Sequence, residues 1–139
     1  MIDHLRIFDL TKWLDDLLKR KPVKFASISP SLIPNEGGIY FISDLSQGLD
    51  EVTYIGLSGN LRQRIYTNQF QGDKNASQIK EALIEHKRAR DLASAKGYLK
   101  KYCHVLFDVV QDYREREMRE GFAIAIIKPQ FSLYKSKEH

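Results

Sequence analysis

The sequence has a single cysteine, Cys103, among its 139 residues. One cysteine excludes a disulfide framework and a four-ligand zinc site, and it favours a reducing compartment such as the cytoplasm. A chain of this length buries about two-thirds of its unfolded surface as one compact domain, so it does not need such supports.

Long hydrophobic runs are also lacking. The longest uninterrupted one, residues 122–127, is far shorter than the ~20 residues that a transmembrane helix requires. The first twenty residues contain four aspartates, which fits neither a secretory signal nor a transit peptide. We therefore expect a protein without membrane contact that is located in the cytoplasm.

The excess of positive charge is small and unevenly distributed. The chain has 22 lysines and arginines against 18 acidic residues, a net charge of +4. Residues 1–59 have a net charge of −2, whereas residues 60–139 have a net charge of +6. A phosphate-binding surface is therefore expected in the later part of the chain, although a charge run alone is also typical of a solvated helix face.

Periodic patterns predict the elements of the first half. Apolar residues at helical spacing predict an N-terminal helix that stops at a basic segment before Pro22. Residues 22–38 contain three prolines, so we expect an extended connector with at most a short turn. Two β-branched and aromatic runs, 38–43 and 52–58, predict an antiparallel hairpin.

The second half alternates between helix and strand signals. Asn60, Ser77 and Asp112 each suit the first turn of a helix, and residues 103–110 predict a third, buried strand. Two glycines interrupt helical patterns. Gly97 is a candidate break in its helix, and Gly121 suggests that another element packs closely against it.

Two tripeptides occupy the predicted hairpin, Gly38-Ile39-Tyr40 and Tyr54-Ile55-Gly56. Either one alone is explained by an ordinary strand in a core. Together they resemble the paired signature of the GIY-YIG nuclease family. The resemblance implies an α/β (α+β) domain, with a small, mainly antiparallel three-stranded sheet flanked by helices, to which an N-terminal helix is added. It implies a nuclease domain at residues 37–132, after a helix and connector at 1–36 and before a tail at 133–139.

Arg64 lies ten residues after Tyr54, the offset at which the family has a helix-borne catalytic arginine. Its competitor, Arg62, is expected to point more toward solvent, because Arg64 borders the apolar stripe of Leu61 and Ile65. An arginine offers planar, permanently charged donors to a phosphate oxygen. The alternative is a surface arginine that pairs with a carboxylate.

Glu120 fits the metal-binding glutamate of the family, which lies two to three turns before a Lys-Pro stop, here Lys128-Pro129. Glu115 and Glu117 fit this count less well. The alternative for Glu120 is an ion pair with Arg116, one helical turn earlier, because such pairs are common on helix surfaces.

The resemblance assigns roles to these residues. Glu120 would hold one Mg²⁺ or Mn²⁺ ion, and Arg64 would stabilise the charged transition state of phosphodiester hydrolysis. Tyr40 would orient or deprotonate the attacking water, with Tyr54 beside it. Positions that the resemblance assigns to support or to nucleic-acid contacts are Gly56, Ser58, Asn60, Arg62, Asn68 and Ser132.

Three positions depart from the family pattern. Leu57 replaces a lysine that is frequent in the excision-repair branch, Asn68 replaces a histidine or tyrosine, and Ser132 replaces the closing asparagine. These departures leave the four central residues intact but bear on the rate of cleavage.

The resulting prediction is a metal-dependent DNA endonuclease of bacterial or phage type that acts on duplex or branched DNA. The alternatives are a weak or inactive nucleic-acid-binding module and a partner-dependent subunit. Because no helix-turn-helix or zinc finger is recognisable, sequence specificity would have to come from a partner protein, from a homodimer or from the loop at residues 69–78.

Overall fold

The computed structural model describes residues 1–73 and 75–131. Its strands are β1 (Val23–Lys24), β2 (Gly38–Asp44), β3 (Glu51–Ser58) and β4 (Cys103–Val109). Its α-helices are α1 (His4–Leu18), α2 (Gln78–Glu85), α3 (Leu92–Tyr102) and α4 (Tyr113–Ile127). A π-helical segment, η3 (Gln63–Phe70), and two 3₁₀ turns, η1 (Phe25–Ser27) and η2 (Pro30–Leu32), complete the elements.

The four strands form one antiparallel sheet in the order β1-β4-β2-β3. The predicted hairpin and third strand are confirmed, and β2 is the central strand between β3 and β4. One expectation is incomplete. The connector contributes β1, in which Val23 pairs with Val105 and Lys24 with His104, so the sheet has four strands rather than three. Two extended residues give no recognisable strand signal, and their partner lies far along the chain.

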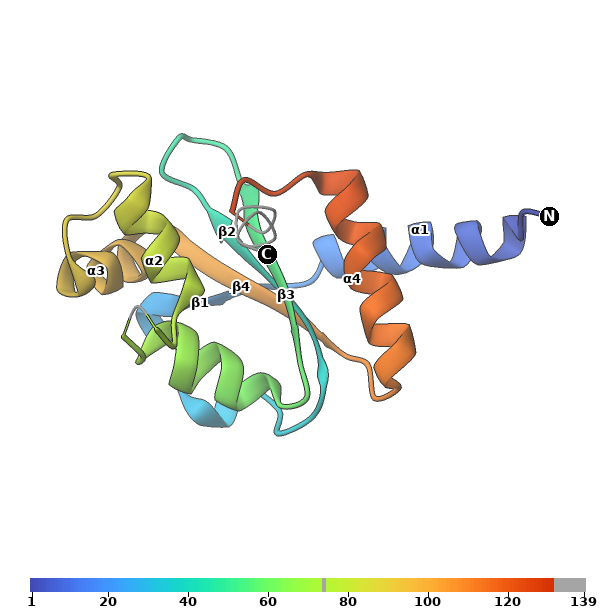
Figure 1. Cartoon of the computed structure of the whole chain (residues 1–139), viewed down its shortest axis with the longest axis horizontal. Helices are drawn as coiled ribbons and strands as arrows, with labels where there is room; N and C mark the ends of the chain where they lie inside the picture. The colour runs from blue at the N-terminus through green and yellow to red at the C-terminus, as the bar shows by residue number, and fades with distance from the viewer. Residues whose placement is uncertain (74, 132–139) are drawn as a thin grey trace.

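Helices cover both faces of the sheet (Figure 1). Side chains alternate along a strand, so Ile39 and Phe41 of β2 face one side while Tyr40 and Ile42 face the other. The first side packs against α1 and α4, and the second packs against η3, α2 and α3. Every residue of β2 is buried, because both of its faces are covered.

The predicted helix α1 is attached to the sheet by its second half. Leu14 and Leu17 are buried, and the indole Nε1 of Trp13 donates to Oδ2 of Asp108 at 2.8 Å. The first half extends past α4 (Figure 1), and there Leu5 and Phe8 remain 77% and 64% exposed. Among the helices of the described residues, none has both the length and the apolarity to cross a membrane.

Local hydrogen bonds cap the predicted helices at the residues that the sequence indicates. The side chains of Asn60, Ser77 and Asp112 each accept a hydrogen bond from the backbone N–H three residues later. Such caps satisfy backbone donors that have no partner inside the helix. The segment after Asn60 is π-helical, a conformation that is frequent at functional sites.

The two expectations for helical glycines are wrong. Gly97 lies inside α3 without interrupting it, and Gly121 has no close neighbour. A Cβ at either position would meet no described atom within 4 Å beyond the chain neighbours and the helix backbone.

We therefore expect Gly97→Ala to raise the free energy of unfolding by about 1 kcal/mol, because alanine loses less backbone entropy in a helix. Urea denaturation of both proteins measures the difference. Gly56→Ala is the contrasting control, since its Cβ would lie 2.6 Å from the ring of Tyr40 and must destabilise. An equal loss of stability in both variants would contradict the open environment of Gly97.

Candidate active site

An open cavity of about 480 Å³ lies beside the edge strand β3. All four residues predicted to be catalytic line it. The lining residues are Tyr40, Tyr54, Gly56, Leu57, Arg64, Gln78, Glu117 and Glu120. The structure therefore brings together side chains that are as many as 80 positions apart in the sequence, counted from Tyr40 to Glu120.

The cavity collects side chains from both faces of the sheet. Tyr40 and Tyr54 belong to the core beneath η3 and α2, whereas Leu57 packs with the core beneath α4. Glu120 lies on α4, which contacts β3. Because β3 is the last strand of the sheet, groups from its two faces can meet at this edge.

The two tyrosines form the inner wall of the cavity. Their ring centroids are 5.9 Å apart, and the residues are only 1% and 7% exposed. The ring of Tyr40 lies over Gly56, its partner across the hairpin, where a Cβ would approach the ring to 2.6 Å. Glycine at position 56 is thus required by the position of the tyrosine.

Burial dominates the acidity of both phenols. It raises the pKa of Tyr40 well above its usual value, and Tyr54 adds to the rise, while the Gln69 hydrogen bond and the charge of Arg64 oppose it. Burial likewise raises the pKa of Tyr54, against the hydrogen bond from Tyr40 and the charge of Arg64. Both hydroxyls are therefore protonated at neutral pH.

Two glutamines hold the tyrosine hydroxyls, and the sequence analysis missed both. Nε2 of Gln69 donates to Oη of Tyr40 at 2.8 Å, and Oη of Tyr54 donates to Oε1 of Gln78. A signal for Gln69 was available. It continues the buried stripe of Leu61 and Ile65 at a spacing of four, and a polar residue on an apolar stripe is informative.

Arg64 in η3 and Arg62 immediately before η3 have different surroundings. Arg64 lines the cavity and is half-buried. Arg62 is also half-buried, and its Nε donates to the backbone oxygen of Ile33 at 2.8 Å. The expectation that Arg62 points more toward solvent than Arg64 is not confirmed, because both are half-buried and the backbone of the connector accepts a hydrogen bond from Arg62.

The half-buried carboxylate of Glu120 has no positive partner in the part of the chain that the structure describes. Burial, and secondarily the charge of Glu117, raises its pKa from the usual 4.5 to about 7. The alternative ion pair with Arg116 is not formed. Arg116 instead donates to the backbone oxygens of Val110 and Gln111, at 3.0 and 3.1 Å. Within residues 1–73 and 75–131, no ion pair or hydrogen bond neutralises the Glu120 side chain.

This carboxylate suits a hard divalent cation. The described residues contain no group of three or more His, Cys, Asp or Glu side chains that could hold a metal ion by themselves. Mg²⁺, however, is commonly held by one or two carboxylates, with water and substrate phosphate as the other ligands. Glu120, with Glu117 in the same cavity, provides such an incomplete set of oxygen ligands.

Several predicted supporting residues are used locally. Oγ of Ser58 donates to the backbone oxygen of Asn60 and accepts from its N–H, which closes the turn between β3 and η3. Asn68 is half-buried on η3. Ser132 lies outside the described residues.

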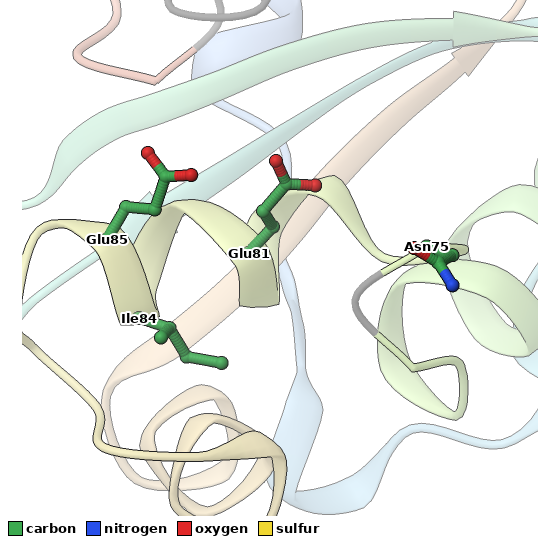
Figure 2. A pocket seen from close by; sticks show the side chains of 4 residues that line it. All are labelled: Asn75, Glu81, Ile84 and Glu85. Carbon is green, nitrogen blue, oxygen red and sulfur yellow. The ribbon is translucent and has the colours of Figure 1, made fainter.

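A second cavity, of about 220 Å³, is unsuited to phosphate. Figure 2 shows the carboxylates of Glu81 and Glu85 on one side of α2, with Ile84 on another side and Asn75 on the neighbouring loop. The described residues that line this cavity include these two acidic side chains but no arginine or lysine, so they offer phosphate no cationic donor of the kind that Arg64 provides in the larger cavity. The chemistry expected of the chain is therefore sought in the larger cavity.

Comparisons with known proteins give one kind of match. No protein-family model matches the sequence, and no curated protein matches it. Among solved structures, the chain is similar to the GIY-YIG N-terminal endonuclease domain of UvrC from Thermotoga maritima, in two point mutants and a magnesium-bound form. The identity is 16%, the TM-score is 0.44, and the alignments cover 74% of this chain and 89–90% of that domain. That domain is bound to its catalytic divalent cation.

Proposed function

We propose that this protein is a divalent-metal-dependent endonuclease that hydrolyses phosphodiester bonds in DNA. The observation that carries the proposal is the cavity in which two tyrosines, one arginine and the carboxylate of Glu120, which has no cationic partner among the described residues, meet. Hydrolysis of a phosphodiester needs a cation near the phosphate, a donor to its oxygens and a group that positions water. The cavity offers one residue type for each need.

The residues take the following roles. Glu120 would hold Mg²⁺ or Mn²⁺, which when bound neutralises charge on the phosphate. Arg64 directs its guanidinium donors to the non-bridging oxygens of the phosphate, where negative charge grows during the reaction. Tyr40 orients or deprotonates the attacking water beside Tyr54. Because burial keeps the Tyr40 hydroxyl protonated in the free protein, orientation is the role that the hydroxyl can perform directly.

A second candidate is a DNA-binding module with weak or no cleavage. It is favoured by the apolar Leu57 in the wall of the cavity and by Asn68 in place of a proton-transfer residue. A homodimer or a specificity-supplying partner stays a prediction, for which the exposed Leu5 and Phe8 of α1 offer contact area. The domain division and a cytoplasmic setting of bacterial or phage type stay predictions from the sequence.

A nicking assay on supercoiled plasmid tests the proposal. We expect relaxed plasmid to accumulate with Mg²⁺ or Mn²⁺ and not with excess EDTA. Branched DNA of the same sequence, assayed in parallel, tests the preferred substrate. Absence of cleavage under all of these conditions, together with duplex binding that weakens steeply as salt is raised, would replace the nuclease by the binding module.

A further inference from the structure

Gln69 is completely buried, and its side-chain amide can adopt only one orientation. Its Oε1 accepts hydrogen bonds from the backbone N–H of Ile79 at 3.1 Å and from Oγ of Ser77 at 3.3 Å. Rotation of the amide by half a turn would place its NH₂ group against the N–H of Ile79, donor against donor. The start of α2 therefore determines that Nε2 faces the tyrosines.

This orientation sets the direction of a chain of hydrogen bonds. Nε2 is only a donor, so Oη of Tyr40 accepts from it at 2.8 Å. With its oxygen accepting from Gln69, the hydroxyl of Tyr40 has its hydrogen free to point toward Tyr54, whose ring is stacked on its own with the centroids 5.9 Å apart. Oη of Tyr54 in turn donates to Oε1 of Gln78. The expected direction of donation is therefore from Gln69 through both tyrosines to Gln78.

The direction decides what the tyrosines offer to a water molecule. Each phenol hydrogen points to the next group in this series of hydrogen bonds. Each phenol oxygen still has a lone pair that its neighbour does not use. A water in the cavity can therefore donate to these oxygens and keep a lone pair for the phosphorus atom. If the amide of Gln69 were absent, the hydrogen of Tyr40 would be free to rotate toward the water. The water would then no longer be held as a donor to the phenol oxygens.

We propose that Gln69 is a positioning residue that makes the hydroxyls of Tyr40 and Tyr54 acceptors for the attacking water. The inference rests on the nuclease function proposed above. Packing does not explain the amide, because methionine has a similar length and would continue the apolar stripe of Leu61 and Ile65. Gln69 does not reach DNA, because it has no exposed surface.

The first test does not depend on activity. The protein is labelled at Cζ of tyrosine, and the resonances of Tyr40 and Tyr54 are assigned with Y40F and Y54F. Gln69→Met removes the donor, and Gln69→Glu keeps the length but presents an oxygen to Tyr40. Gln63→Met, at an exposed position of the same helix, is the matched control. We expect both Gln69 variants to change the Cζ shift of Tyr40 at neutral pH, and Gln63→Met to leave it unchanged. An unchanged Tyr40 resonance in both folded variants would overturn the hydrogen-bond assignment.

The second test separates positioning from binding. On supercoiled DNA with Mg²⁺, we expect Gln69→Met to lower kcat about tenfold or more with little change in KM, since positioned proton-transfer groups contribute at least this much. Gln69→Glu should lose as much or more, although it preserves the contact with Ile79. If the wild type cleaves DNA and both Gln69 variants have the same kcat as the wild type, this inference alone is overturned. A wild type that never cleaves DNA overturns the proposed function instead.

Discussion

Glu120→Gln is expected to lose DNA cleavage by at least a hundredfold and yet to be at least as stable as the wild type in EDTA. A bound cation supplies several kcal/mol of charge stabilisation, and about 1.4 kcal/mol corresponds to a factor of ten. The amide keeps the size of the side chain but removes its negative charge, so the cation loses its protein ligand. Nicking of supercoiled DNA with Mg²⁺ measures the loss.

The stability part of this prediction follows from the pKa of Glu120. The folded-state pKa, about 7, is above the usual 4.5, so the folded protein binds the proton more tightly than the unfolded chain. The charged form therefore costs stability. This cost is absent below pH 4.5, grows as the pH rises, and is complete above about pH 7. Urea denaturation in EDTA should show that Glu120→Gln gains stability over the wild type across this range.

Metal ions and a control acid complete the test. Mg²⁺ should raise the melting temperature of the wild type and not that of Glu120→Gln, because only the native wild type binds the ion. Glu85→Gln removes an acid from the second cavity and should cleave as the wild type does. Equal cleavage by Glu120→Gln and the wild type would remove Glu120 from the site.

Arg64→Ala is expected to lower kcat by about a hundredfold to a thousandfold, the usual effect of removing one donor to developing negative charge. Arg64→Lys should recover only part of the rate, because an ammonium group cannot donate two parallel hydrogen bonds. DNA binding, measured by fluorescence anisotropy in EDTA, should weaken much less than kcat falls. The reason is that the contact strengthens mainly in the transition state.

The matched control for Arg64 is Arg90→Ala, which removes the same charge from an exposed position between α2 and α3. It should change cleavage little. If both arginine variants lose the same modest amount of activity and affinity, Arg64 contributes only general attraction to DNA. The role assigned to it at the phosphate would then be wrong.

The sequence predictions succeed where a feature depends on residues that are close together along the chain. The caps at Asn60, Ser77 and Asp112 require hydrogen bonds that span three residues, so a short segment suffices to predict them. The strand β1 has two residues whose partners lie about eighty positions away, and no local pattern indicates it. The corrections at Gly97 and Gly121 have a similar cause, because packing against a helix depends on elements remote in the chain.

The sequence by itself determined the four residues predicted to be catalytic, but not the two glutamines that hold the tyrosine hydroxyls. The spacing of Tyr40, Tyr54 and Arg64, and the position of Glu120 before the Lys-Pro stop, are properties of the chain alone. These spacings do not depend on the fold. The tertiary structure decided how these groups meet. Only the strand order places β3 at the edge, where the tyrosines of one face and Glu120 of the other reach one cavity. Only the start of α2 gives the amide of Gln69 its direction, because that direction depends on a backbone N–H ten residues away.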